Sequence, residues 1–546
     1  MKNPTMTAGA SAPHQKFDQY RAYKARPLTK DQKKDVTFLF GGLTWKHERL
    51  LEGAFQNMGL KAQALPNVER ADLDTGKEMI DAGACCPTTF VTGNLANFLK
   101  KKVAEEGKDA ATNKYAYLTA GACGACRFGQ YHESYNMALD AMGLKDFRIF
   151  LLAQDKMDQG ESEDGALDLS MPFTTAAYMA VLIGDILTDL EYITRPYEVV
   201  PGTTDRVLKE CADYLYEVFK NRPIVGKRPA RGHHPWWRRR PAFLGSAGSL
   251  MWNLSTKYFT NALKEVGKRW ATIEVDRLRM KPKVKITGEF WLQTHEGDGN
   301  YNIKRWLEKE GAEVVPPPIV VWIDYLIRAD LIQTLEARRE IIKNAGLKIW
   351  LGKMAQKMIH FIYNKLRKAV GFIPYYVPDQ YEIRRLAAPY YHMRLSGGEG
   401  DMLVGKALMY YHKKAVHMIC ELSPYSCMPN TMSIGAMAAV QGKYPDLLYA
   451  PIEVKGDAEV HAISRCQMIL TEARKRSQAE YDKVLAELGL TEARIREYEA
   501  KHPELRQATY RVPHYGVAGT AANYAIHIAK RMGIKNGYKE TNVYGK

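Results

Sequence analysis

The sequence alternates short apolar runs of strand length with longer segments of helical periodicity. Its first run, "DVTFLFGG" (35–42), is continuously apolar, and the helix-like "HERLLEGAFQNMG" follows it. Continuous runs are typical of strands buried on both faces, as in parallel sheets. Strand-length runs recur at "KYAYLTA", "FRIFLLAQD" and "AVHMICEL", and a second α/β unit begins at "KPKVKITGEFWL". The pattern predicts an α/β protein, with parallel sheets covered by helices on both faces.

The length of 546 residues predicts two or three domains. Its apolar content of 46% and charged content of 25% are ordinary for a globular protein with a sizeable core. Changes in composition suggest a division into a flexible N-terminal segment (1–34), an α/β domain (35–220), a basic linker or insertion (221–280), a second α/β domain (281–470) and a charged helical extension (471–546).

The formal net charge of +17 favours anionic partners. Seven Lys and Arg residues and no acid occur in "RPIVGKRPARGHHPWWRRRP" (222–241). This segment is either a clamp for CoA phosphates, nucleic acid or an acidic protein, or a basic surface insertion. Nucleic acid is the less expected partner, because no nucleic-acid-binding signature accompanies the segment.

A membrane span or a secretory signal is not expected from the sequence. The most apolar stretch, 176–187, is interrupted by Gly184 and Asp185, and a span needs roughly 18 apolar residues. The N-terminus lacks the apolar core of a signal peptide. We therefore expect a cytoplasmic protein without a membrane partner.

The eight cysteines favour metal binding, redox work or buried thiols over disulfides. Five of them lie in predicted loops that precede helices: Cys85, Cys86, Cys123, Cys126 and Cys427. In parallel sheets such loops gather at the carboxyl edge of the strands, and helix N-termini stabilise thiolates. We expect these loops, from two domains, to converge on one cleft.

Other interpretations of the cysteines remain open. Cys211, Cys420 and Cys466 fit core positions in amphipathic or strand-like segments. The pair Cys123 and Cys126 is alternatively an ordinary loop pair, a redox dithiol or, with the adjacent pair before Pro87, a zinc site.

A phosphate-binding loop is not expected in "GEGDMLVGKA" (398–407), although Gly400, Gly405 and Lys406 have the required spacing. Ala407 stands where a Ser or Thr would hold magnesium, and no clear strand precedes the motif.

Several longer motifs carry a family resemblance. The runs "GACCPTTFVTGNLANFL", "GACGACRFGQYHE", "VKITGEFW", "GGEGDMLVGKAL" and "ELSPYSCMPNTM" resemble, in order and spacing, the 2-hydroxyacyl-CoA dehydratase superfamily. The long branch associated with CoA-enzyme activases is the most similar, and double-cubane-cluster proteins and benzoyl-CoA reductase subunits are related. The resemblance spans roughly residues 35–470 and implies two Rossmann-like (flavodoxin-like) domains, with an iron–sulfur cluster in the cleft between them.

The resemblance also implies cofactor, ligands and partners. Cys86, Cys126 and Cys427 would hold a 4Fe-4S cluster. A double-cubane 8Fe-9S cluster needs more thiolates, for which Cys85, Cys123 and Cys466 are candidates. The electron donor would be an ATP-hydrolysing activase of the actin/Hsp70-like class, a separate protein. The substrate would be a CoA thioester or a small molecule, and a homo- or hetero-oligomer is expected.

Residues beside the cysteines are candidates for tuning the cluster. Arg127 would offset negative charge, and Ser423, Tyr425 and His132 are further candidates. Two other functions remain: an electron-relay subunit without catalysis, favoured by the lack of a clear acid/base pair beside the cysteines, and a zinc-stabilised or metal-free protein that binds CoA or nucleic acid.

Overall fold

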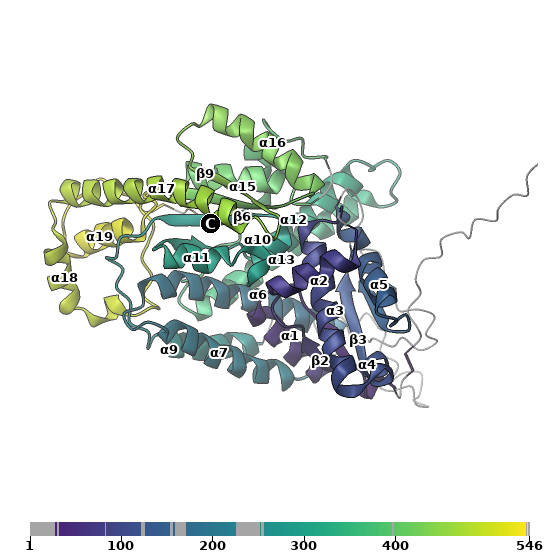
Figure 1. Cartoon of the computed structure of the whole chain (residues 1–546). Helices are drawn as coiled ribbons and strands as arrows, with labels where there is room; N and C mark the ends of the chain where they lie inside the picture. The colour runs from purple at the N-terminus through teal and green to yellow at the C-terminus, as the bar shows by residue number, and fades with distance from the viewer. Residues whose placement is uncertain are drawn as a thin grey trace, which may run out of the picture.

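The computed structural model contains two parallel sheets joined by a layer of helices (Figure 1). It describes residues 28–29, 32–81, 83–121, 126–152, 157–158, 171–224, 252, 256–395, 398–541 and 543. In Figure 1 the first sheet lies at the lower right and the second above it. The prediction of an α/β protein with two parallel sheets is therefore confirmed.

The first sheet has the strand order β2-β1-β3-β4-β5. Its strands are β1 (Thr37–Phe40), β2 (Lys61–Ala64), β3 (Tyr115–Ala120), β4 (Arg148–Leu152) and β5 (Met157–Asp158). The first four strands are parallel, and β5 is antiparallel to β4. Phe38 and Phe40 pack into one core cluster, whereas Leu39 packs into another. Both faces are buried, as the continuous apolar run predicts.

Helices of the first unit cover these two faces and carry the loops of interest. They are η1 (Gln32–Lys34), α1 (Trp45–Asn57), α2 (Arg70–Met79), α3 (Cys86–Glu106), α4 (Lys108–Lys114), η2 (Arg127–Gln130) and α5 (Tyr131–Ala141). Within the segment 1–34, which we expected to be flexible, Leu28 is buried in the core beside Phe38.

The second sheet has the order β7-β6-β8-β9, with all neighbours parallel. Its strands are β6 (Lys283–Gly288), β7 (Glu313–Val315), β8 (Met418–Pro424) and β9 (Tyr449–Val454). Counted along the chain, β1 to β4 and β6 to β9 have the same arrangement, 2-1-3-4. The helices associated with the second sheet are α10 (Phe290–Thr294), η5 (Asp298–Asn300), α11 (Ile303–Lys309), α14 (Gln380–Ala387), α15 (Asp401–His412) and α16 (Met428–Lys443).

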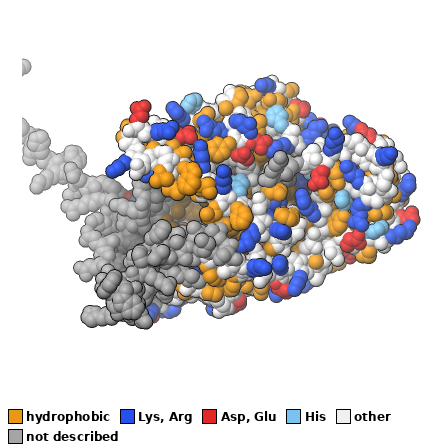
Figure 2. Space-filling model, turned by 180° about the vertical axis from the view of Figure 1, so that it is seen from behind, with side chains coloured by type: hydrophobic (Ala, Val, Ile, Leu, Met, Phe, Trp, Pro, Cys, Tyr) orange, Lys and Arg blue, Asp and Glu red, His pale blue; other side chains and the backbone are white. Residues whose placement is uncertain are grey.

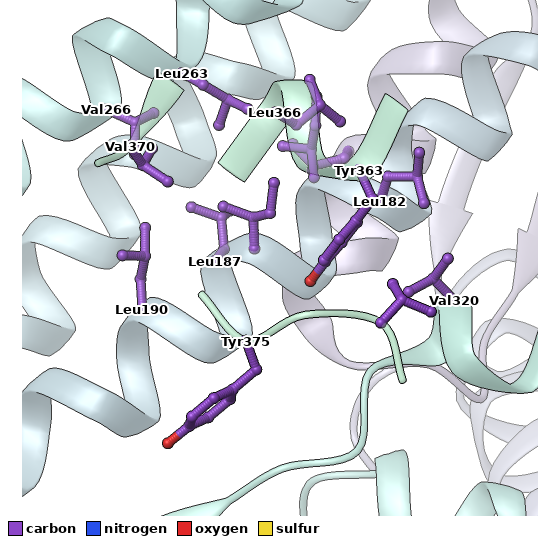
Figure 3. Close-up of a cluster of buried hydrophobic side chains, with 14 of the residues drawn as sticks. Leu182, Leu187, Leu190, Leu263, Val266, Val320, Tyr363, Leu366, Val370 and Tyr375 are labelled. Carbon is purple, nitrogen blue, oxygen red and sulfur yellow. The ribbon is translucent and has the colours of Figure 1, made fainter. Parts of the chain in front are cut away.

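A shared helical core links the two sheets (Figure 3). Its helices are α6 (Met171–Thr194), η3 (Arg195–Tyr197), α7 (Thr203–Lys220), α9 (Tyr258–Trp270), α12 (Ile319–Asp330), the π-helix η6 (Leu331–Glu336) and α13 (Ala345–Ala369). Leu187 of α6, Leu263 of α9 and Leu366 of α13 belong to one buried cluster. Among the described helices, α6 alone is long and apolar enough to cross a membrane, and most of it is buried in this core.

The C-terminal helices form a core of their own. They are α17 (Glu459–Leu488), α18 (Glu492–Ala500), η7 (Pro503–Arg506) and α19 (Thr520–Arg531). Ile526 and Tyr524 of α19 are fully buried against α17 and α18. The basic segment 222–241 falls almost wholly outside the described residues, but its first residue, Arg222, is buried and donates to the Pro172 carbonyl at 2.6 Å.

Two acidic side chains of α6 accept hydrogen bonds from backbone amides in the second half of the chain. Asp185, which interrupts the apolar stretch in the sequence, accepts hydrogen bonds from the Ile319 and Val320 amides, both at 2.8 Å. These amides open α12, where N–H groups lack helical partners. One turn further along α6, Asp189 accepts from the Tyr375 amide at 2.9 Å. Acidic side chains inside this apolar helix therefore anchor its neighbours through hydrogen bonds.

Stability should depend on pH through Asp189. Burial, with the nearby Asp185 charge, raises the pKa of Asp189 to about 8. The folded state therefore keeps a proton that the unfolded state releases near pH 4, and stability falls as pH rises from about 4 to 8. We expect Asp189→Asn to remove a slope of up to about 1.4 kcal/mol per pH unit. Urea unfolding at several pH values from 5 to 8 measures this, and parallel curves for the two proteins would contradict it.

Helices α2 and α3 pack closely because a glycine on each helix lies against the backbone of the other helix. A Cβ at Gly93 would lie 1.8 Å from the Asp72 carbonyl oxygen, and one at Gly76 would lie 2.0 Å from that of Thr89. Substitution at either position must push the helices apart. This matters for function because α3 begins at Cys86.

We expect Gly93→Ala to destabilise the protein by about 1–3 kcal/mol, the usual cost of overpacking. Gly435→Ala is the matched control, because Gly435 is also helical and its added Cβ would meet nothing within 4 Å. The control should be neutral or stabilising by up to about 1 kcal/mol. Urea unfolding under reducing conditions compares the two. Equal effects at both positions would rule out the packing argument.

Candidate functional site

Four described cysteines lie where helices begin. Cys85 is the N-cap of α3 and Cys86 its first residue, with Pro87 next. Cys126 precedes η2 in the loop after β3, and Cys427 is the N-cap of α16 after β8. The predicted positions of these four thiols at helix starts are thus confirmed. Cys123, the fifth candidate, lies outside the described residues.

Thiols from the loops of both sheets are influenced by the same charged groups, and we call this shared environment the thiol neighbourhood. Burial, together with the charges of Glu289, Glu399 and Cys85, raises the pKa of Cys126 to about 12. Burial also raises the pKa of Cys427, to which Glu289, Glu399 and Cys126 contribute. Cys126 is therefore among the groups that act on Cys427, although the two thiols follow strands of different sheets.

Cys86 belongs to the same neighbourhood. Its pKa is raised by burial and then by Cys85 and Glu289. The thiols are therefore protonated at neutral pH unless a cation joins them.

The adjacent cysteines face different surroundings. Cys85 packs in the core of the first sheet, where its Sγ lies 2.9 Å from the Thr88 hydroxyl and 3.3 Å from that of Tyr131. Cys86 packs instead with residues of the second unit, among them Trp291. One backbone turn thus presents one thiol to each half of the protein.

Two carboxyl groups accompany the thiols, and the sequence analysis did not identify them. Glu289 follows β6 directly and caps α10, accepting from the Trp291 and Leu292 amides at 3.0 and 2.9 Å. Glu399 is buried, and burial together with the Glu289 charge raises its pKa to about 8. The signal for Glu289 was its position right after a strand-ending glycine, at the edge where ligands bind.

Lys406 and Glu421 extend this buried polar group. Burial lowers the pKa of Lys406 to about 8, against the opposing charges of Glu399 and Glu421. Burial raises the pKa of Glu421 to about 7, although the Tyr449 hydroxyl donates to it. Because α15 runs through Gly405 and Lys406, no open loop is present there to hold a phosphate. This agrees with the exclusion of a phosphate-binding loop.

The other candidates take varied positions. Arg127 donates to the Gly83 carbonyl and so ties the Cys126 loop to the start of α3. Ser423 is buried, whereas Tyr425 is half exposed under Lys455. His132 pairs with its neighbour Glu133 at 3.0 Å.

The remaining thiols are core residues in this structure. Cys211 is buried in the helical core on α7. Cys420 and Cys466 are both fully buried in the core of the second sheet, and their side chains are hydrogen-bonded to one another. This is the position that the sequence favours for all three.

A small cavity lies between the end of β1 and α10. Its volume of about 20 Å³ is enough for about one water molecule. Its lining comes from both units and includes Gly42, Glu48, Asn94, Trp291 and His295. Both ring nitrogens of His295 are buried without a hydrogen-bond partner among the described residues, and burial lowers its pKa to about 3. A bound water would satisfy this neutral ring.

Within the described residues, no three His, Cys, Asp or Glu side chains come close enough together to hold a single metal ion. The zinc site considered from the sequence includes Cys123, which lies outside the described residues.

Comparison with known proteins adds no further constraint. No protein-family model, no curated protein and no solved structure matches this chain. The interpretation of the site therefore depends on its geometry and on the chemistry of its thiols and carboxyl groups.

Proposed function

We propose that this chain is an iron–sulfur protein of the 2-hydroxyacyl-CoA dehydratase and double-cubane type. It would accept low-potential electrons from an ATP-hydrolysing activase and use them for a difficult reduction or a radical dehydration. The main support is that Cys86, Cys126 and Cys427, from loops of both sheets, are all influenced by the charge of Glu289. Both units are then Rossmann-like, and the repeated 2-1-3-4 strand order supports this.

The donor set fits a cluster. Thiolates are the usual ligands of iron–sulfur clusters, and these thiols lie at helix N-termini, which stabilise negative charge. The charges that act most strongly on Cys126 and Cys427 are negative, so deprotonation requires a bound cation. Cys86, Cys126 and Cys427 would hold the cluster, which would supply one-electron chemistry. Cys123 and Cys85 remain further candidates.

Two buried carboxyl groups of the protein would supply and accept protons at the site. Glu289 and Glu399 are like charges in a buried place, which favours retention of a proton on the Glu399 carboxyl. Such a proton is available beside the thiols for a reaction that adds or removes hydrogen. A pure electron relay would lack an acid/base pair beside the thiols, whereas Glu289 and Glu399 would supply such a pair.

Anaerobic purification followed by iron, sulfide and zinc analysis tests the proposal. We expect a brown protein with about four irons per chain for a 4Fe-4S cluster, or about eight for a double cubane. Reduction by an activase with ATP, followed by electron paramagnetic resonance, should change the signal of the cluster. A colourless protein that holds zinc, or no metal, would reject the proposal.

A further inference from the structure

The first half of α13 lies on the surface of the protein. From Gly346 to Ala355, every residue except Ile349 and Gly352 is exposed. The second half is anchored, because Ile359, Tyr363 and Leu366 pack in the shared helical core. The buried second half of α13 therefore fixes the position of the exposed first half.

Large hydrophobic side chains form a continuous stripe along α13. The first four, between 347 and 354, are linked by spacings of three and four residues, and the fifth follows seven residues later, so all share one face. We name Leu347, Trp350, Leu351, Met354 and Phe361 the α13 stripe; their exposed fractions are 57%, 57%, 52%, 40% and 62%. Isolated exposed apolar residues are ordinary, but a contiguous row marks an interaction surface.

Unpaired cations accompany the stripe. Six exposed Lys and Arg residues lie on α13 or in the segment just before it: Arg338, Arg339, Lys343, Lys348, Lys353 and Lys357. None of the six makes an ion pair with another described residue, whereas Arg476 on α17 pairs with Glu472 at 3.1 Å. No Asp or Glu occurs in the sequence between Glu340 and Asp379. Figure 2 shows hydrophobic and cationic side chains side by side on the face it draws.

We propose that the α13 stripe docks on an anionic lipid surface. A helix with an apolar face and flanking lysines is the form of an interfacial membrane helix, and an indole such as that of Trp350 suits the headgroup level. Each nearby cation adds attraction to anionic lipid. A second copy of the chain would bring the same cations together, and an exposed helix offers no groove for a peptide.

This contact differs from a membrane span. The expectation of no membrane partner came from the absence of a long apolar run, and a helix that lies in the interface needs no such run. The stripe is independent of the thiol site, so the proposal stands whether or not a cluster is present.

Vesicle sedimentation of the full-length protein tests the proposal. We expect binding to vesicles of equal parts phosphatidylcholine and phosphatidylserine, weak binding to phosphatidylcholine alone, and loss of binding in high salt. The double variant Trp350→Ser with Leu351→Ser should lower the partition coefficient roughly tenfold or more.

A matched control distinguishes binding through the α13 stripe from nonspecific binding through any exposed hydrophobic residue. Val460→Ser with Met468→Ser changes two residues of α17 that are 77% and 76% exposed, and it should leave binding unchanged. Equal loss in this control, or equal binding to both vesicle types, would overturn the proposal. So would a dimer, seen by light scattering without lipid, that the stripe variant dissociates.

Discussion

Cys427→Ala should purify without its cluster. Cys427 supplies the thiol from the second sheet, so its loss leaves a cluster held from one side. We expect iron and sulfide to fall about tenfold or more in anaerobically prepared protein, with loss of the visible absorption. Cys126→Ala and Cys86→Ala should behave alike. Because the Cys427 side chain is only partly buried, the fold itself should lose little stability.

Cys211→Ala is the matched control, since Cys211 is a buried thiol in the helical core away from the site. It should retain full iron content, although core truncation lowers stability somewhat. Circular dichroism verifies that each variant is folded before metal analysis. Retention of iron by Cys427→Ala, or loss of iron from Cys211→Ala, would exclude the proposed ligand set.

The two cluster types differ in their sensitivity to Cys85 and Cys123. A three-thiolate 4Fe-4S site should tolerate Cys85→Ala, because the Cys85 sulfur is already engaged by Thr88 and Tyr131. A double cubane that uses Cys85 should instead lose about half its iron. Iron counts for Cys85→Ala and Cys123→Ala therefore distinguish the two.

Much of the sheet architecture can be predicted from local pattern alone. Strands buried on both faces leave a continuous apolar run, and β1 and β8 were located by such runs. The shared helical core could not be predicted in this way. Asp185 breaks the apolar stretch of α6, yet its purpose becomes evident only when the amides of α12 meet it. Contacts across so long a sequence separation leave no periodic signal.

The candidate site, too, could be predicted from the sequence only in part. Cys126 and Cys427 could be placed at helix starts because loops and helices are local features. Glu399 could not be recognised, since a Glu beside a glycine is common, and only the position of Glu289 after a strand-ending glycine was a signal. Their significance comes from burial next to each other and to the thiols, which depends on how the two sheets pack.

Arg328→Met should strongly destabilise the protein. Arg328 donates two hydrogen bonds to Asp401, at 2.7 and 2.6 Å, and both side chains are almost fully buried. Removal of one partner leaves a buried charge without compensation, at a cost of about 3–5 kcal/mol. The pair joins α12 to the start of α15, two residues after Glu399, so its loss should also loosen the carboxyl side of the site.

Urea unfolding at 25 °C measures this cost, and Arg305→Met is the matched control. Arg305 pairs with the exposed Asp205 at 3.1 Å and is itself substantially exposed. Such pairs contribute about 0–1 kcal/mol. Arg305 also lies 3.7 Å from the buried Glu191, but Lys46 and Arg195 still pair with that carboxylate when Arg305 is lost. The double variant Arg328→Met with Asp401→Leu should recover much of the lost stability, because no unpaired charge remains buried. If Arg328→Met costs no more than Arg305→Met, the buried pair does not hold α12 and α15 together.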